Sequence, residues 1–267
     1  MDLGFTGAKA VVTGGSKGMG LAIAETLGAE GASVAIMARG RRGLDSAAER
    51  VRSAGAPEVL ALSVDMADAE SIAAGYAAVG DAWGQLNVLV HTIGPSAGPF
   101  EELDDDDWHT AFDLGTMSAV RSVRAALPML RAAEWARIVT LSAHSIQRQS
   151  ARLVAYTATK AALSSFTKNL AKSLGPEGIL VNCVCPGTIV TASFTEVLKD
   201  TLAAEGLDSA DPHDVMKWVE NTYGHPCDIG RAGLPEEIAS ATAYLASRRN
   251  GYVTGATVNV DGGSDFI

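Results

Sequence analysis

The chain has 267 residues, with 21 Lys and Arg against 31 Asp and Glu, which gives a formal net charge of −10. That sign opposes binding to nucleic acid or to an anionic membrane surface. No apolar run approaches the roughly 18 residues that a membrane span needs. Apolar residues make up 47% of the chain, as in an ordinary globular protein. We therefore expect a single folded domain at residues 1–267, with no nucleic-acid and no membrane partner.

The cysteines indicate the compartment and argue against a metal site. Cys183, Cys185 and Cys227 are an odd set in a long chain, and residues 1–4 lack the basic and apolar stretches of an export signal. A cytoplasmic location is the expectation. Cys183 and Cys185 lie in an apolar run typical of a strand, with no second ligand pair at zinc spacing. We expect no bound metal.

Seven apolar runs rich in β-branched residues recur along the chain, with helical stretches between them. The runs are residues 10–12, 34–36, 59–62, 88–90, 138–141, 180–184 and 258–260; helical stretches include residues 20–30, 44–54, 68–83, 108–131 and 156–174. Short apolar strands that alternate with helices are typical of a parallel sheet covered on both faces. The sequence therefore predicts an α/β fold with one doubly wound, seven-stranded parallel sheet.

Two segments need a separate interpretation. Four aspartates, Asp104 to Asp107, precede the helical stretch at Trp108, and carboxylates favour a helix N-terminus, so we interpret them as a helix cap rather than a cation site. Between Thr191 and Arg231 no strand-like run occurs. Two amphipathic patches stand there instead: Phe194, Val197, Leu198 and Leu202, then Val215, Met216, Trp218 and Val219. We expect a helical lid at about residues 192–230.

A glycine-rich loop follows the first predicted strand and opens the first predicted helix. Its residues include Gly14, Ser16, Lys17, Gly18, Met19 and Gly20. Missing side chains let the backbone approach a pyrophosphate, and the helix start offers unpaired amides and the positive end of the helix dipole. In this position, between a strand and a helix, the loop predicts a dinucleotide-binding site.

The end of the second predicted strand indicates which dinucleotide binds. An acidic residue there would hold a ribose hydroxyl, whereas arginine would hold a 2′-phosphate. Here Arg39 follows Ala38, Arg41 and Arg42 come next, and Lys17 lies in the glycine loop. These cations favour NADP(H) over NAD(H). The alternative, that they are solvated surface charges, stays open above all for Arg41 and Arg42.

Tyr156 and Lys160 begin a helical stretch four residues apart and share one face of it. A phenol has a pKa of about 10, and a nearby ammonium favours phenolate and lowers that value. We therefore expect Tyr156 to act as a general acid and base, with Lys160 beside it.

These motifs occur in a familiar order. The glycine loop, Tyr156-x-x-x-Lys160, the run from Pro186 to Thr191 and the ending Val260-Asp261-Gly262-Gly263 resemble the single-domain, 3-oxoacyl-carrier-protein-reductase-like branch of the short-chain dehydrogenase/reductase family. The resemblance implies a Rossmann-type fold, hydride transfer at a carbonyl or alcohol carbon, and dimers or tetramers formed through helices 108–131 and 156–174. It further implies that Lys160 bonds the nicotinamide ribose. The other cofactor contacts that it implies are Asp65 and Met66 at the adenine, Ile189 and Thr191 at the carboxamide, and Ile93, Gly94, Pro186 and Gly187.

The chain departs from the family pattern at three positions. The serine that the family carries thirteen residues before the tyrosine is Ala143 here. Side chains alternate along a strand, so Ser145 is the favoured substitute and Ser142 the second; His144, water or no replacement stay open. The helix asparagine of the family aligns with Gly115. The family's Asn-Asn-Ala-Gly reads His91-Thr92-Ile93-Gly94, and we expect His91 to bond the backbone rather than to titrate.

The sequence favours an NADP(H)-dependent carbonyl reductase or alcohol dehydrogenase. Apolar patches in the lid suggest a hydrophobic ketone, such as a 3-oxoacyl thioester, a ketosteroid or a polyketide. The alternative, motivated by Ala143 and Gly115, is a catalytically impaired NADP(H)-binding sensor or scaffold with the same fold. A lyase or isomerase on this fold is a third possibility. The sequence leaves open the substrate, the direction of reaction and the choice between dimer and tetramer.

Overall fold

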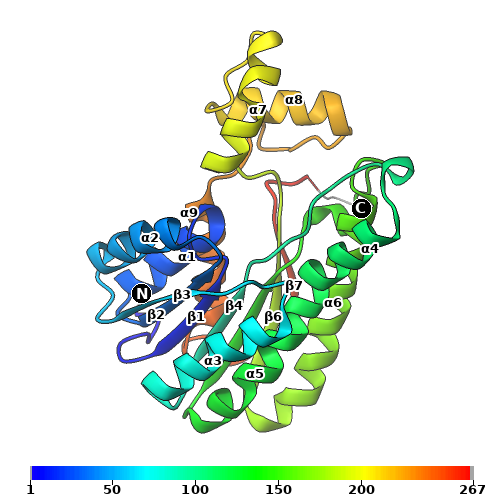
Figure 1. The fold of residues 1–267 in the computed structure, drawn as a ribbon. Helices are drawn as coiled ribbons and strands as arrows, with labels where there is room; N and C mark the ends of the chain where they lie inside the picture. The colour runs from blue at the N-terminus through cyan, green and yellow to red at the C-terminus, as the bar shows by residue number, and fades with distance from the viewer. Residues whose placement is uncertain (1, 265–267) are drawn as a thin grey trace.

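The computed structural model describes residues 2–264, whose strands form one seven-stranded parallel sheet (Figure 1). The strand order is β3-β2-β1-β4-β5-β6-β7, and every neighbouring pair is parallel. This confirms the predicted fold, and each of the seven apolar runs is a strand. Their bounds are β1 Lys9–Thr13, β2 Ser33–Ala38, β3 Val59–Ser63, β4 Val88–His91, β5 Ala136–Leu141, β6 Ile179–Pro186 and β7 Thr257–Val260.

Helices cover both faces of the sheet (Figure 1). Val11 and Val12 are neighbours on β1, yet they belong to two separate apolar clusters, because successive side chains on a strand point to opposite faces. The cluster on one face includes residues of α1, α2 and α9, and the cluster on the other includes residues of α3, α5 and α6. Those helices are α1 Gly18–Ala29, α2 Arg41–Ala54, α3 Ala69–Trp83, α5 Ser118–Ala132, α6 Val154–Leu174 and α9 Pro235–Ala246.

The stretch predicted as one helix over 108–131 has a different structure. It begins as α4 at Asp105–Phe112, widens into a π-turn at Asp113–Met117 and continues as α5. The aspartates cap it as predicted: the Asp107 amide donates to Asp104 Oδ1 at 2.9 Å, and the Asp104 amide donates to Asp107 Oδ2 at 3.1 Å. The π-turn was not predicted, and such turns concentrate at functional sites.

Residues 192–230 form two helices that stand away from the sheet beyond the end of β6, α7 Ala192–Ala204 and α8 Pro212–Tyr223 (Figure 1, yellow to orange). They share a small apolar cluster of their own, which includes Leu202, Val215 and Trp218. Val197, from the first predicted patch, is 77% exposed. The patches therefore form helices, and much of their apolar surface packs within this segment.

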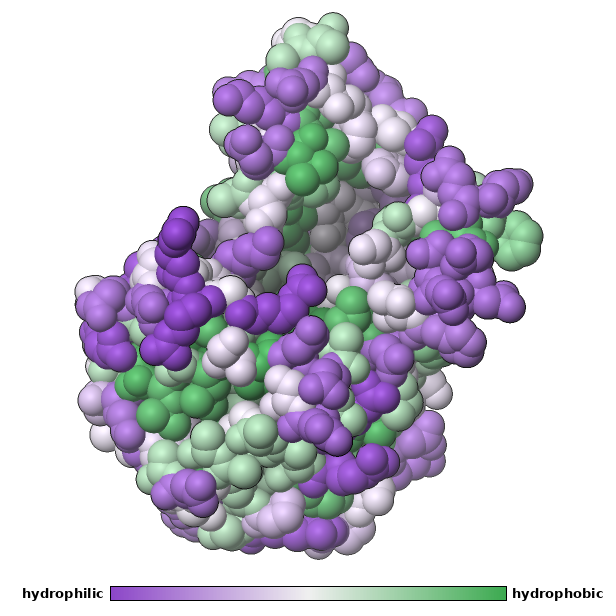
Figure 2. Space-filling model, viewed as in Figure 1, coloured by the Kyte–Doolittle hydropathy of each residue, from purple (hydrophilic) through white to green (hydrophobic). Residues whose placement is uncertain are grey.

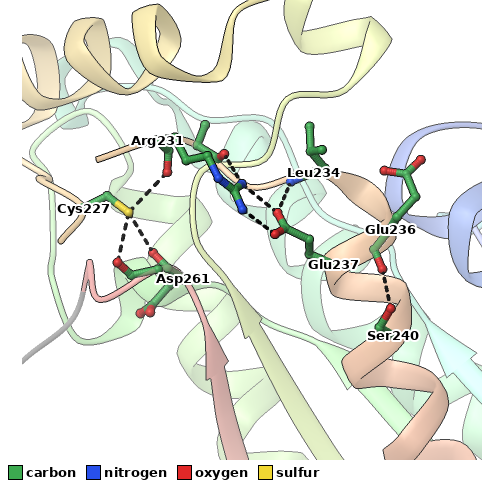
Figure 3. A network of polar contacts seen from close by, with 9 residues as sticks. Cys227, Arg231, Leu234, Glu236, Glu237, Ser240 and Asp261 are labelled. Atoms are coloured by element: carbon green, nitrogen blue, oxygen red, sulfur yellow. Dashed lines mark hydrogen bonds and ion pairs between the residues drawn. The ribbon is translucent and has the colours of Figure 1, made fainter. Parts of the chain in front are cut away.

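A polar network lies where that segment returns to the sheet (Figure 3). The guanidinium of Arg231 donates to both carboxylate oxygens of Glu237 on α9, at 2.9 and 2.6 Å. The same carboxylate accepts the Leu234 amide at 2.8 Å. The thiol sulfur of Cys227 lies 3.3 Å from the carbonyl oxygen of Arg231 and 3.5 Å from that of Asp261, beyond β7. These contacts fix the base of the α7–α8 segment to the body of the protein.

Candidate active site

Two adjoining recesses lie at the carboxyl edge of the sheet, where parallel α/β sheets place their ligands. Met19 and Thr191 line both of them. We call the larger one the loop recess. It has a volume of about 700 Å³ and is lined by Gly14, Ser16, Lys17, Gly18, Met19, Gly20, Ala38, Arg39, Gly40, Gly43, Val64, Asp65, Met66, Thr92, Ile93, Gly94, Leu114, Thr191 and Ser193.

The glycine loop has the backbone that an anion site requires. Gly14 has φ of +70°, and a Cβ on it would lie 2.4 Å from Thr92 Oγ1. A Cβ on Gly20 would lie 2.3 Å from the Gly14 carbonyl oxygen. Helix α1 begins beside them, and its N-cap residue, Lys17, makes no side-chain capping hydrogen bond among the described residues. The first amides of α1 can therefore bind a phosphate, and these residues fit a dinucleotide.

The predicted cations are not all at the loop recess. Arg39 and Lys17 line it. Arg41 instead pairs with Asp45 at 3.1 Å, one helical turn along α2, and neither Arg41 nor Arg42 is among the described residues that line it. For these two arginines the structure favours the solvated surface alternative.

We call the second recess the tyrosine recess. It has a volume of about 340 Å³ and lies between the end of β5, the connection from β6 to α7, and α8. Figure 2 shows a hollow beneath the α7–α8 segment, with hydrophobic residues along its walls. Its lining residues are Met19, Ser142, Ala143, His144, Ser145, Leu153, Tyr156, Pro186, Gly187, Thr188, Ile189, Thr191, Phe194, Val219, Tyr223 and His225. Pro186, Gly187 and Ile189, predicted as cofactor contacts, thus line this recess rather than the loop recess.

Tyr156 and Lys160 lie on the first turns of α6, and Lys160 is fixed from two strands. Its Nζ donates to the carbonyl oxygen of Ile93, after β4, at 2.8 Å and to that of Leu141, at the end of β5, at 2.7 Å. The same Nζ lies 5.9 Å from the centre of the Tyr156 ring. Lys160 is only 3% exposed, so backbone carbonyl oxygens take the place of water around its ammonium group.

The electrostatics of this pair differ from the expectation. Burial raises the pKa of Tyr156 to about 12, whereas the sequence predicted that Lys160 would lower it. The prediction was wrong for this structure because removal from water disfavours phenolate, and the neighbouring Cys185 acts in the same direction. Burial also lowers the pKa of Lys160 to about 8. At neutral pH the phenol therefore keeps its proton, and Lys160 is close to its titration range.

The residues around Ala143 differ in where their polar groups point. Ser142 donates to the Lys160 carbonyl oxygen at 2.8 Å and so is engaged with the backbone of α6. Ser145, 1% exposed, accepts a hydrogen bond from Thr157 Oγ1 at 3.2 Å. His144 Nε2 lies 3.3 Å from His225 Nδ1. The Ser142 proton is thus used by the backbone of α6, whereas Ser145 acts as an acceptor in its contact with Thr157 and keeps its own proton for another partner.

Gly115 lies within the π-turn and has no room for a larger residue. A Cβ there would lie 2.4 Å from Thr159 Oγ1 and 2.6 Å from Thr159 Cβ. The asparagine that the family pattern predicts at this position would clash with α6. The lysine contacts to Ile93 and Leu141 therefore form without any side chain from residue 115.

His91 contradicts its prediction in part. Its ring bonds side chains rather than the backbone: Nδ1 lies 3.1 Å from Thr13 Oγ1, and Nε2 lies 3.0 Å from Ser118 Oγ. Burial, with the charge of Lys160 as a second cause, lowers the pKa of His91 to about 3. It does not titrate near neutral pH, as expected.

The sequence reasoning missed three residues of the tyrosine recess, Leu153, Tyr223 and His225, and included Thr188 only as part of the run from Pro186 to Thr191. His225 comes from the segment after α8 and meets His144, which is 81 positions away in the chain. Neither histidine belongs to a spacing motif, so composition and order carried no signal for the pair.

A nucleotide-sized recess at a helix N-terminus, beside a tyrosine and a buried lysine, defines a dinucleotide-dependent oxidoreductase of the Rossmann type. A family model described as "Enoyl-(Acyl carrier protein) reductase" matches residues 14–265. The chain is 32% identical over 255 residues to the short-chain reductase protein NovJ of Streptomyces niveus (95% of this chain, 92% of that one). It is 32% identical over 266 residues to 3-oxoacyl-[acyl-carrier-protein] reductase FabG of Salmonella typhimurium (99% and 100%).

Among solved structures, L-sorbose reductase of Gluconobacter frateurii, complexed with NADPH and L-sorbose, superposes with a TM-score of 0.91 at 33% identity (99% of this chain, 98% of that one). The chain belongs to the short-chain dehydrogenase/reductase family, as the sequence predicted, and is an oxidoreductase of that family. Of the helices formed by residues 2–264, none is both long and apolar enough to cross a lipid bilayer.

Proposed function

We propose that this protein uses NADPH to reduce the ketone of a small molecule to a secondary alcohol in the tyrosine recess. The observation that carries the proposal is the position of Tyr156: its phenol lines the tyrosine recess, and Lys160 on the same helix face bonds Ile93 at the edge of the loop recess. A proton donor thus lies where the two recesses adjoin. Holding donor and substrate together in this way supplies a large part of such catalysis.

NADP(H) is the cofactor, in agreement with the sequence and with the NADPH of the L-sorbose reductase complex. Bound NADPH supplies a hydride from C4 of its nicotinamide. We assign the pyrophosphate to the glycine loop and the first amides of α1, and the 2′-phosphate to Arg39 and Lys17. Asp65 and Met66 line the far part of the loop recess, where the adenine would lie, and Ile93, Gly94 and Thr191 line its other end.

Tyr156 donates its proton to the carbonyl oxygen of the substrate as the carbonyl carbon is reduced. The raised pKa keeps this proton on the phenol at neutral pH, which suits reduction rather than oxidation. Lys160, held by two carbonyl oxygens, places positive charge next to the phenolate that forms and stabilises it. We assign Ser145 the role of the missing serine, a hydrogen bond to the substrate oxygen.

For the substrate, we propose first the predicted hydrophobic ketone, such as the 3-oxoacyl thioester reduced by the FabG relative. Its support is the apolar part of the tyrosine recess, which includes Leu153, Phe194 and Val219. A polyhydroxy ketone is the second candidate. Polar residues of the same recess favour it, since His144, Ser145 and His225 also line it and L-sorbose is the ligand of the structural neighbour.

The sensor alternative is not favoured, because the relatives are named reductases and the tyrosine and lysine are both present. We propose that the whole chain acts as one catalytic domain, with residues 192–230 as the lid over the substrate. We also propose a dimer or tetramer through α5 and α6. Phe112, which lies just before the π-turn and α5, is a large apolar side chain left 39% exposed.

The experiment follows NADPH absorbance with a panel that contains a 3-oxoacyl thioester, a cyclic apolar ketone and L-sorbose, for the parent and for Ser145→Ala and Ser142→Ala. We expect turnover of at least one apolar ketone and a loss of about 10²–10³ in kcat for Ser145→Ala. We expect a much smaller loss for Ser142→Ala. A greater loss for Ser142→Ala would transfer the role to Ser142, and turnover of L-sorbose alone would select the second substrate class.

A further inference from the structure

His91 lies beneath the loop recess, completely buried at the end of β4. Three segments that line the recess meet around it. Thr13, which precedes the glycine loop, lies on one side of the ring, and Ser118, at the start of α5, lies on the other. The next residues along the chain from His91 are Thr92, Ile93 and Gly94, all of which line the loop recess.

The hydrogen bonds fix the position of the ring proton. Ser118 Oγ lies 2.5 Å from the carbonyl oxygen of Leu114 and donates its single proton there, because a carbonyl only accepts. Ser118 Oγ must therefore accept from His91 Nε2, at 3.0 Å. The ring carries its proton on Nε2.

The other side of the ring agrees with this assignment. The Thr92 amide donates to Thr13 Oγ1 at 3.2 Å, so that hydroxyl is free to donate its own proton to His91 Nδ1 at 3.1 Å. One directed chain results, from the Thr92 amide through Thr13, His91 and Ser118 to the Leu114 carbonyl. Every donor in it meets an acceptor when the ring is neutral. In a charged ring both nitrogens would carry a proton, so Nδ1 would also have to donate, and the Thr13 hydroxyl would lose its acceptor. The charge would also be repelled by that of Lys160.

This chain reaches both the cofactor region and the catalytic lysine. Leu114 belongs to the π-turn and lines the loop recess. Thr92 Oγ1 donates to the Thr13 carbonyl oxygen at 2.6 Å, next to Gly14. Ile93, two residues after His91, provides the carbonyl oxygen that accepts from Lys160 at 2.8 Å. A shift of the end of β4 would therefore move an acceptor of the lysine directly.

We propose that His91 is a positioning residue for hydride and proton transfer: its neutral ring, protonated on Nε2, fixes the glycine loop, the end of β4 and the π-turn relative to one another, and through Ile93 it fixes Lys160. The inference rests on the proposed function for its catalytic consequence. The structural part of the proposal is that His91 has a single tautomer within one directed chain of hydrogen bonds. This part can be tested without measuring turnover.

The first test is spectroscopic. The chain has five histidines, and two-bond proton–nitrogen correlation spectra of protein labelled with ¹⁵N-histidine report the tautomer of each. The His91 signal is assigned by its loss in His91→Asn. We expect a proton on Nε2 and no titration between about pH 5 and pH 8, where an ordinary histidine changes its charge. A proton on Nδ1, or titration within that range, would overturn the proposal.

The second test separates positioning from simple stability. His91→Asn keeps one donor and one acceptor, whereas His91→Phe removes both. We expect kcat of the Asn variant within about threefold of the parent and a loss of about 10–10² for the Phe variant, the range for a misplacement of about 1 Å. The pH at which kcat falls, set by Lys160, should also move in the Phe variant, and NADPH should bind more weakly.

The matched control is Asn250→Ala. Asn250 is buried, bonds the carbonyl oxygens of Leu245 and Val253, and lines neither the loop recess nor the tyrosine recess. The melting temperature of this variant should fall, whereas its kcat per folded molecule should stay at the parental value. If His91→Phe behaves like this control, keeping the parental kcat and pH profile, His91 has only a structural role. If the parent reduces no ketone, the proposed function fails. The spectra and the NADPH affinities still test whether His91 has the proposed tautomer and positions the loop recess.

Discussion

Gly115 and Thr159 lie so close together that a methyl group on residue 115 would be 2.4 Å from Thr159 Oγ1. The contact joins the π-turn to α6, the helix that carries Tyr156 and Lys160. This position requires glycine rather than the asparagine that the family pattern predicts, since α6 occupies the space. The close approach is part of how the catalytic helix is placed against the cofactor region.

Gly115→Ala should therefore destabilise the protein by about 1–3 kcal/mol, the range for overpacking of a filled site. For a chain of this length each kcal/mol corresponds to a fall of about 2–4 °C in Tm, which thermal unfolding measures. Gly80→Ala is the matched control: Gly80 lies inside α3, and its Cβ would meet only Met129 Sδ at an ordinary 3.5 Å. It should be neutral or slightly stabilising. Equal Tm values for Gly115→Ala and the parent would show that α6 adjusts freely.

Arg39→Ala should weaken NADPH binding by about 10–100-fold, the equivalent of one or two charged hydrogen bonds, and leave NADH binding nearly unchanged. Arg39 lines the loop recess, and a 2′-phosphate is what distinguishes the two cofactors. Arg41→Ala is the control, because Arg41 is engaged with Asp45. Fluorescence titration with both cofactors measures the affinities. A similar loss for NADPH and NADH would place Arg39 away from the 2′-phosphate.

The rate of ketone reduction should fall as pH rises through about 8. Burial lowers the pKa of Lys160 to about 8, so the ammonium is present below that pH and lost above it. Tyr156, with a pKa raised to about 12, stays protonated throughout and adds no second step. The measurement is kcat against pH for the parent and for Lys160→Met. The variant should be slower at every pH and should lack the step, and a step that persists in it would assign the titration to another group.

Glu237 should stabilise the protein except in acid. The hydrogen bonds from Arg231, followed by that from the Leu234 amide, lower its pKa from 4.5 to about 2 (Figure 3). The carboxylate then contributes stability above about pH 4.5, and this contribution is lost as the pH falls towards 2. The pair is half exposed, so the effect is below about 1 kcal/mol.

The measurement is the Tm difference between the parent and Glu237→Gln, taken near pH 7 and near pH 3. The difference should be present at the higher pH and shrink at the lower one. Glu236→Gln is the control, since its carboxylate makes no hydrogen bond or ion pair to another described residue. A difference that stays constant with pH would contradict the account.

Much of the fold could be predicted from periodicity alone. The apolar runs on both faces of the sheet mark all seven strands, because a parallel sheet buries every residue of its central strands. The aspartates before Trp108 mark the helix start through simple capping chemistry. The π-turn could not be predicted, because it depends on the fit between Gly115 and Thr159, which are 44 positions apart in the chain.

Less of the candidate site could be predicted, and the reason is burial. The Tyr156 and Lys160 pair is visible as a spacing, but the sign of the Tyr156 pKa shift depends on how much water the fold removes. The contacts of His91 and the meeting of His144 with His225 join segments that are distant in sequence. Motifs indicate which residues can do chemistry, and the three-dimensional neighbours decide their protonation.

The measurement that tests the central claim most directly compares Tyr156→Phe with the parent in two assays. One is NADPH binding by fluorescence, and the other is oxidation of NADPH by the best ketone of the panel. The account predicts binding within about twofold of the parent and a loss of about 10²–10⁴ in kcat, the contribution of a general acid. A variant that turns over at the parental rate would contradict the assignment of Tyr156 as the proton donor.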